Sequence, residues 1–343
     1  MKALYYIGDK TMELREVPRP AAAAGKYLVR LRANGICGSD LEGDRGTTGR
    51  RIPPMVMGHE ASGTVEEAPA GGKHAPGERV VIFPKPFCGV CDSCRRGLVN
   101  VCPSGYCMGV MDANGSMAEF VALEEKYLLP FSPDLSFAQA ALTEPLAVAY
   151  RSVHKLSDQE IADAEYCMVI GAGTIGLMVV GLLKLRGARN IIVSDSVPLR
   201  LDLARKMGAA FTVDPRSADT GAAVKEITRG KGCDFVLEAV GIGATASASL
   251  EVLRMGGTAV WIGNAQKLVE VNMQRIVTAE LTIKGNYIYD YTGFQASLRL
   301  LERKELDPTL LITHTYSLEE GVRAFRELDA CRDGSMVKVM LES

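Results

Sequence analysis

The cysteines of this chain are unevenly distributed, and five of the nine lie between positions 88 and 107. Four of these five follow the spacing Cys-x2-Cys-x2-Cys-x7-Cys, which is typical of a zinc-binding lobe. Four thiolates complete the tetrahedral shell of zinc, so such a site supports the fold and leaves no position for a substrate. The first residues lack the pattern of a secretion signal, which favours metal over disulfides or free thiols. The predicted structural zinc ligands are Cys88, Cys91, Cys94 and Cys102.

A second group of candidate ligands is dispersed along the chain. Cys37 lies in the segment Gly-Ile-Cys-Gly-Ser-Asp, and His59 and Glu60 lie in Gly-His-Glu. Glu144 is a further acid, in Thr-Glu-Pro-Leu. A thiolate, an imidazole and a carboxylate form a zinc shell that keeps one position open, as a catalytic zinc requires. Taken singly, each of these residues is more often structural, and periodicity alone does not bring them together.

Residues 171–176 read Gly-Ala-Gly-Thr-Ile-Gly between an apolar strand and an apolar helix, the context of a dinucleotide-binding loop. Gly171 allows the tight turn, Gly173 lets a pyrophosphate approach the backbone, and Gly176 lets helix and strand pack closely. Asp195 ends the next predicted strand, where a carboxylate binds the ribose hydroxyls and repels a 2′-phosphate. NAD is therefore favoured over NADP, and Arg200 could stack on the adenine. A flavin or another nucleotide is the competing choice of ligand.

These residues lie in two regions with different patterns of secondary structure. Up to about residue 145 the chain reads as short strands separated by Gly, Pro and Asn turns. The predicted strands there are Tyr27–Arg32, Gly63–Val65, Arg79–Phe83 and Glu119–Leu123. After Leu142, apolar strands alternate with helices, which predicts right-handed βαβ units and a doubly wound parallel sheet. Its last helix and strand are predicted at Ala244–Met255 and Thr258–Ile262, and the strand would form an exposed edge.

Composition restricts the class of protein. With 343 residues, 47 % of them hydrophobic, the chain is long enough for roughly two folded domains. The 39 Lys and Arg residues against 41 Asp and Glu residues give no electrostatic reason to expect nucleic acid as a partner. No apolar run approaches the ~18 residues of a membrane span. A small-molecule partner and a reducing, cytoplasmic location are the expectation.

The whole chain resembles the zinc-dependent medium-chain dehydrogenase/reductase superfamily, and within it the sorbitol and polyol dehydrogenases. The resemblance covers essentially the full length, and its motifs occur in the superfamily's order. They are Gly35–Asp40, Gly58–Val65, the four-cysteine lobe, Glu144-Pro-Leu and Gly171–Gly176. It implies a mainly-β GroES-like catalytic domain with an inserted α/β Rossmann domain. The expected boundaries are 1–146, with the zinc lobe at 86–107, then 147–284 for the Rossmann domain and 285–343 for the rest of the catalytic domain.

The resemblance also implies roles for single residues. Cys37 and His59 would be ligands of a catalytic zinc, with either Glu60 or Glu144 as the third protein ligand. Ser39 would begin the proton relay, and Asp40 would orient the metal-bound imidazole. The implied cofactors are two zinc ions per chain and NAD, with a homodimer or homotetramer as the assembly. Further nucleotide contacts are implied for Thr174, Ile175, Val240, Ile262 and Gly263.

The implied reaction is the oxidation of a secondary alcohol to a ketone with hydride transfer to NAD. Glu42 and Gly43 replace a His-Tyr pair found in many polyol enzymes, and Ile288 replaces an arginine. These departures leave the substrate open between a polyol and a polyol phosphate, with Arg50-Arg51 as a candidate anion-binding pair. Glu42 could instead pair with the ammonium group of a threonine-like β-hydroxy amino acid. The residues also leave open a vicinal diol as the substrate and, more distantly, a non-catalytic NAD-binding protein.

Overall fold

The computed structural model describes residues 1–22, 25–46 and 49–343, which form two compact units. Unit 1 comprises Met1–Glu144, Asp290–Arg332 and Lys338–Ser343, and unit 2 comprises Pro145–Tyr289 and Asp333–Val337. Unit 2 is thus inserted between parts of unit 1, and a short segment before the last strand also belongs to it.

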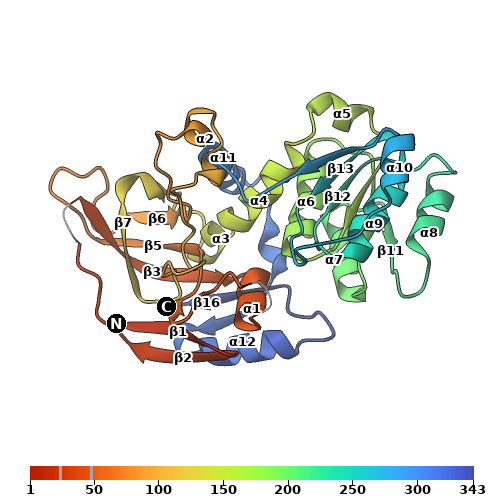
Figure 1. Cartoon of the computed structure of the whole chain (residues 1–343). Helices are drawn as coiled ribbons and strands as arrows, with labels where there is room; N and C mark the ends of the chain where they lie inside the picture. The colour runs from red at the N-terminus through yellow and green to blue at the C-terminus, as the bar shows by residue number, and fades with distance from the viewer. Residues whose placement is uncertain (23–24, 47–48) are drawn as a thin grey trace. The chain divides into compact units, whose positions relative to one another are not determined.

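Unit 1 is built on a seven-stranded sheet with the order β15-β16-β3-β5-β6-β8, in which β7 also pairs with β3 (Figure 1). Its strands are β3 (Lys26–Ile36), β5 (Glu60–Glu67), β6 (Arg79–Ile82), β7 (Phe120–Glu124), β8 (Leu128–Pro130), β15 (Ile312–Ser317) and β16 (Lys338–Glu342). All four predicted strands of this region are present. A smaller sheet has the order β2-β1-β4, with β1 (Lys2–Gly8), β2 (Thr11–Glu16) and β4 (Met55–Val56).

A core cluster of unit 1 contains buried apolar side chains of β3, β5 and β6, and in β3 exposed Arg30 and Arg32 interrupt the buried ones. Helix α3 packs on β3 and β5 and covers this sheet. The helices of the unit are α1 (Gly38–Asp44), α2 (Asp92–Arg95), α3 (Phe137–Ala141), α11 (Tyr291–Glu302) and α12 (Gly321–Ala330), and α4 (Thr143–Val153) begins at its boundary. Short 3-10 turns lie at Val99–Val101, Glu125–Tyr127, Pro308–Leu311 and Leu318–Glu320.

Unit 2 has a six-stranded parallel sheet with the order β11-β10-β9-β12-β13-β14, which confirms the predicted doubly wound Rossmann fold. Its strands are β9 (Tyr166–Ile170), β10 (Asn190–Ser194), β11 (Phe211–Val213), β12 (Cys233–Glu238), β13 (Leu253–Trp261) and β14 (Thr282–Gly285). Its helices are α5 (Asp158–Asp163), α6 (Thr174–Leu185), α7 (Pro198–Met207), α8 (Thr220–Ile227), α9 (Gly243–Glu251) and α10 (Met273–Thr278). Apolar runs in β9, β10 and β12 are buried, as expected of strands covered on both faces.

Two predictions for the end of this sheet are wrong. The helix expected to reach Met255 ends at Glu251, because residues 253–261 form the long strand β13. The strand at 258–262 is not the edge, because β14 pairs with β13 in parallel and lies outside it. A short exposed strand such as Thr282–Gly285 has little apolar periodicity, so the sequence pattern did not indicate it.

Candidate active site

The sheet of unit 1 positions the dispersed candidate ligands. Strand β3 ends at Ile36, helix α1 begins at Gly38, and Cys37 caps that helix in an extended conformation. Strand β5 begins at Glu60 and pairs antiparallel with β3, so that Gly35 lies opposite Glu60. A Cβ atom at Gly35 would lie 1.9 Å from Glu60 Oε2, so only glycine lets this carboxylate approach. Neighbouring strands thus bring together residues that are distant in sequence.

Cys37, His59 and Glu60 form one of two groups of metal-binding side chains among the described residues. Their ligand atoms all lie within 4.8 Å of one another, and Glu144 is not part of this group. Burial, followed by the negative charges of Glu60 and Asp40, raises the pKa of the Cys37 thiol to about 11. A divalent cation would reverse this effect, because coordination deprotonates a thiol outright. The donor set of sulfur, nitrogen and oxygen fits zinc.

Asp40 lies at the centre of the polar contacts behind these ligands. Its Oδ1 accepts a hydrogen bond from Arg51 Nη2 at 2.7 Å and lies 3.7 Å from His59 Nδ1. This separation is within ion-pair range but too long for a hydrogen bond, and His59 Nδ1 has no hydrogen-bond partner among the described residues. Burial alone would raise the pKa of Asp40, but the charges of His59 and Arg51 more than offset it and lower the pKa.

The interpretation of Arg51 as an anion-binding loop residue is wrong. Its side chain is 1 % exposed and is ion-paired with Asp40, so this guanidinium is not presented to a ligand in solution. Ser39, in contrast, is exposed, and its hydroxyl donates to Cys37 Sγ at 3.3 Å and accepts from Arg51 at 3.2 Å.

The C-terminal strand supplies a residue that sequence analysis missed. Lys338 opens β16, and its Nζ lies 2.6 Å and 2.8 Å from the two carboxylate oxygens of Glu60. It also donates to the carbonyl oxygen of Ile36 at 3.1 Å. A single lysine near the end of the sequence carries no signal of this role, because only the pairing of β16 with β3 places it there.

The four-cysteine lobe brings its predicted ligands together. The sulfur atoms of Cys88, Cys91, Cys94 and Cys102 lie within 4.8 Å of one another. Backbone hydrogen bonds from Val90 and Cys91 lower the pKa of Cys88 to about 6, which favours the thiolate that zinc binds. Cys107 is outside the group, and burial raises the pKa of its thiol to about 12. This donor set fits a closed structural zinc.

The dinucleotide loop of unit 2 has the geometry that its glycines predict. Gly171 has φ +92°, and a Cβ at Gly176 would lie 1.8 Å from the Gly171 carbonyl oxygen. Gly173 caps helix α6, and no atom lies within 4 Å of a Cβ placed there. The backbone amides at the start of α6 are therefore open to a pyrophosphate. Thr174, beside Ile175 in that first turn, donates to the carbonyl oxygen of Val337 at 3.0 Å.

The other predicted nucleotide residues lie at the same edge of the sheet. Ile170, Glu238 and Trp261 are in register at the carboxyl ends of β9, β12 and β13. The residues that follow these strands are Gly171, Val240, Ile262 and Gly263, and Val240 Cγ2 lies 2.5 Å from a Cβ placed at Gly171. Ligands of doubly wound sheets bind at this edge, where the strand order reverses.

Asp195 follows β10 and holds the dinucleotide loop through its carboxylate. Its Oδ2 accepts from Ala172 N at 2.7 Å, and its Oδ1 accepts from Val197 N at 2.8 Å. Arg200 is half-buried, and its Nε has no hydrogen-bond partner among the described residues.

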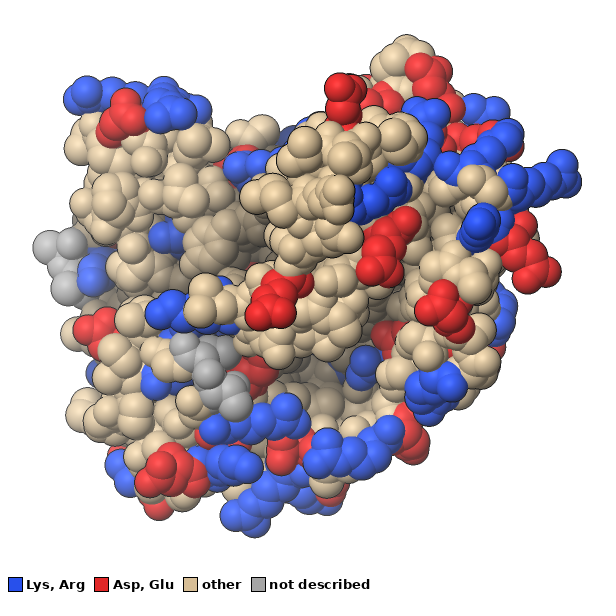
Figure 2. Space-filling model, turned by 45° about the vertical axis from the view of Figure 1, so that its right-hand side comes forward, with Lys and Arg blue, Asp and Glu red and all other residues tan. Residues whose placement is uncertain are grey.

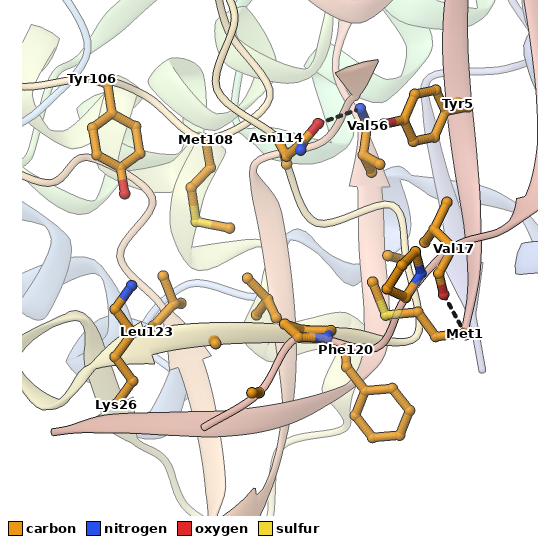
Figure 3. Close-up of a pocket in the computed structure, with 17 residues that line it drawn as sticks. Met1, Tyr5, Val17, Lys26, Val56, Tyr106, Met108, Asn114, Phe120 and Leu123 are labelled. Carbon is orange, nitrogen blue, oxygen red and sulfur yellow. Dashed lines mark hydrogen bonds between the residues drawn. The ribbon is translucent and has the colours of Figure 1, made fainter. Parts of the chain in front are cut away.

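A pocket of about 490 Å³ opens in unit 1 (Figure 3). Tyr5, Met108, Asn114 and Phe120 are among its lining residues, and no candidate metal ligand lines it. Among the described residues that line it, Lys26 is the one with a charged side chain, so we do not assign the catalytic centre to this pocket.

The charged surface and the lengths of the helices say less about function than the metal-binding groups and the dinucleotide loop do. Figure 2 shows basic and acidic side chains interspersed over the face that it draws. Among the described residues, no helix combines the length and the apolar character needed to cross a membrane.

Comparison with known proteins places this geometry in a family. The model of the alcohol dehydrogenase GroES-like domain matches residues 23–133, and that of the zinc-binding dehydrogenase matches residues 174–303. The chain is 30 % identical to sorbitol dehydrogenase of Bacillus subtilis, over 93 % of this chain and 91 % of that protein. It is 33 % identical to D-arabitol-phosphate dehydrogenase of Enterococcus avium, over 98 % of this chain and 95 % of that protein.

A solved structure shows the same arrangement of the fold. L-idonate 5-dehydrogenase of Escherichia coli superposes with a TM-score of 0.91 at 26 % identity, covering 100 % of this chain and 98 % of that one. The two zinc-type donor sets, the dinucleotide loop and these matches lead to one conclusion: the chain belongs to the zinc-dependent, NAD-linked alcohol dehydrogenase family.

Proposed function

We propose that this enzyme oxidises a secondary hydroxyl of a polyol, free or phosphorylated, to a ketone and transfers the hydride to NAD. The observation that carries the proposal is the convergence of Cys37, His59 and Glu60 within 4.8 Å in the sheet of unit 1. The curated relatives named above act on a polyol and on a polyol phosphate, which supports this substrate class.

Glu60 is the proposed third ligand of the catalytic zinc. It belongs to the close group with Cys37 and His59, whereas Glu144 lies outside it. Zinc held by these residues would act as a Lewis acid that lowers the pKa of a substrate hydroxyl. Glu144 is 5 % exposed, and its charge acts on the thiol of Cys107, so its proposed contribution is electrostatic.

Ser39 is the proposed first acceptor of the substrate proton. Its hydroxyl is exposed and lies beside the Cys37 sulfur, so it can take up a proton from an alcohol and release one to solvent. Through the zinc that they would hold, Cys37 and His59 orient the substrate oxygen. The proton leaves this oxygen, and the hydride leaves the carbon that bears it and passes to NAD. One proton and one hydride together account for the two hydrogens that the alcohol loses.

The preference for NAD is assigned to Asp195. Its carboxylate is fixed by the amides of Ala172 and Val197 at the nucleotide edge, where it would repel the extra phosphate of NADP. Arg200 is the proposed adenine-stacking residue. The remaining nucleotide contacts are assigned to the loop residues Thr174 and Ile175 and to Val240, Ile262 and Gly263.

A coupled assay tests the proposed function. Zinc-loaded protein is incubated with NAD and with sorbitol, arabitol, arabitol phosphate, 2,3-butanediol or threonine, and NADH formation is followed. We expect the wild type to turn over polyols and Cys37→Ala to have no activity. The control is Cys331→Ser, which should keep the activity, because Cys331 lies in unit 1 outside both metal groups. Absence of NADH formation with every polyol would contradict the proposal. Turnover of threonine alone would favour an amino-acid substrate, whose ammonium group half-buried Glu42 would bind.

We infer that the enzyme assembles through the β14 edge of unit 2. This strand is exposed, and apolar side chains of the neighbouring elements are exposed with it, including Met273 at 69 % and Val277 at 65 %. Pairing of two copies would cover both the strand edge and these side chains. Light scattering should give a dimer or tetramer, reduced to a monomer by Val277→Glu. The variant Phe211→Glu, at the opposite edge, should leave the mass unchanged.

A further inference from the structure

The segment before His59 inserts a charged side chain into the interior of unit 1. The Arg51 side chain is 1 % exposed, although its neighbour Arg50 is exposed. Space for it comes from Gly43, where a Cβ atom would lie 2.3 Å from Arg51 Cγ. Burying a guanidinium costs several kcal/mol unless the surroundings pair it. The role of the buried Arg51 can therefore be inferred from the groups that pair with its guanidinium.

Among the described residues, the side chains that pair with Arg51 are Ser39 and Asp40, in the first turn of helix α1 that Cys37 caps. A single nitrogen, Nη2, donates to Asp40 Oδ1 at 2.7 Å and to Ser39 Oγ at 3.2 Å. Ser39 Oγ in turn donates to Cys37 Sγ at 3.3 Å, and Asp40 Oδ2 accepts from Cys37 N at 3.2 Å. The guanidinium is thus connected to both the sulfur and the backbone of Cys37.

Arg51 Nη2 also acts on His59 indirectly, through the oxygen of Asp40 to which it donates. Asp40 Oδ1, which accepts from Arg51, lies 3.7 Å from His59 Nδ1. A metal-bound imidazole is usually oriented by an acceptor on its other nitrogen, and Asp40 is the carboxylate that faces this one. Arg51 therefore determines where that oxygen lies and how much of its accepting capacity remains for His59.

We propose that Arg51 is a positioning residue of the catalytic zinc site. It holds the Ser39 hydroxyl and the Asp40 carboxylate, and through them it fixes the directions of Cys37 and His59. It acts through these neighbours and does not itself bind the metal. The inference rests on the proposed function in so far as it assigns zinc to Cys37 and His59.

The test compares Arg51→Met, Arg51→Lys and the matched exposed control Arg50→Met in the full-length protein. The first readout needs no turnover: the visible spectrum of cobalt-substituted protein, and zinc affinity measured by competition with a chelator. We expect Arg51→Met to shift the cobalt bands and to weaken binding of one zinc by roughly 10–100-fold. Arg51→Lys retains the charge, so its cobalt spectrum and zinc affinity should lie between those of Arg51→Met and the wild type. Arg50→Met should have the wild-type spectrum and zinc affinity.

The second readout is the division between kcat and KM. For Arg51→Met we expect kcat on a polyol to fall by about 10–100-fold while KM for NAD is unchanged, because unit 2 is not altered. Removing Arg51 leaves Asp40 buried without its cation, so Asp40→Asn/Arg51→Met is the second variant. It removes both charges and should show the same spectral shift with better stability.

Two results would overturn the proposal. The first is an Arg51→Met protein with the wild-type cobalt spectrum, zinc affinity and kcat. The second is loss of stability alone, with spectrum and zinc affinity unchanged in the double variant, which would make Arg51 a purely structural residue. If the wild type oxidises no polyol, the proposed function fails, while the spectrum and the zinc affinity still decide the role of Arg51.

Discussion

Lys338 and Glu60 are 278 residues apart in sequence and form a buried ion pair, in which both carboxylate oxygens face one ammonium group. Their side chains are 2 % and 1 % exposed. Burial alone would lower the pKa of Lys338, but Glu60, and then Cys37, more than offset it and raise the pKa. The last strand of the chain is thereby tied to a candidate ligand of the catalytic zinc.

Replacing Lys338 should be costly. In the metal-free protein, Lys338→Met leaves the Glu60 carboxylate buried without its cation, and we expect a loss of about 3–5 kcal/mol in stability. Calorimetry should show a lower transition midpoint, with Glu60→Gln/Lys338→Met recovering most of the loss. The matched control is Lys2→Met. Lys2 Nζ lies 2.6 Å from Glu319 Oε1, but this ion pair is exposed and contributes little to stability. Equal shifts for the two lysine variants would contradict the prediction.

The two metal groups should lose zinc independently. Cys37→Ala should reduce the zinc content from two to one per chain and abolish turnover, while NAD still binds to unit 2. Cys94→Ser should also remove one zinc, but it should expose the lobe at 86–107 to proteolysis, because its folding depends on the metal. Metal analysis and limited proteolysis distinguish the variants. A protein that contains one zinc before any substitution would refute one of the two sites.

Gly173 and Gly176 should respond differently to the same substitution. Gly176→Ala places a Cβ 1.8 Å from the Gly171 carbonyl oxygen, so we expect unit 2 to be destabilised. Gly173→Ala meets no atom within 4 Å, so stability should be retained while NAD binding weakens. Thermal unfolding and NAD titration measure the two effects. Unchanged NAD affinity in Gly173→Ala would exclude a pyrophosphate at this amide.

Asp195 should control the choice of cofactor. Asp195→Ser removes the carboxylate that faces the ribose, and we expect the NAD-to-NADP ratio of kcat/KM to fall by roughly 10–100-fold, the effect of losing a charged hydrogen bond. Asp214→Ser is the control. Asp214 directly follows the neighbouring strand β11, and its carboxylate pairs with Arg216. Should both variants change the ratio alike, the assignment to Asp195 would be wrong.

Local signals explain why much of the fold was predictable. In β3 buried Val29 and Leu31 alternate with exposed Arg30 and Arg32, and the apolar runs of β9 and β10 mark strands covered on both faces. Strand β14 and helix α10 were not predicted, because each is short and largely exposed. In such segments the contacts with neighbouring elements decide the conformation, and the residue pattern does not record them.

The sequence by itself determined the sites whose ligands are close in the chain. The cysteine lobe and the glycine loop are local, so spacing and one flanking strand or helix suffice to specify their geometry. Only the tertiary structure decided the catalytic group: strand pairing selected Glu60 over Glu144 as a neighbour of Cys37, added Lys338, and turned Arg51 inward to Asp40. These are contacts between distant segments, and a buried charge finds its partner only once the sheet has formed.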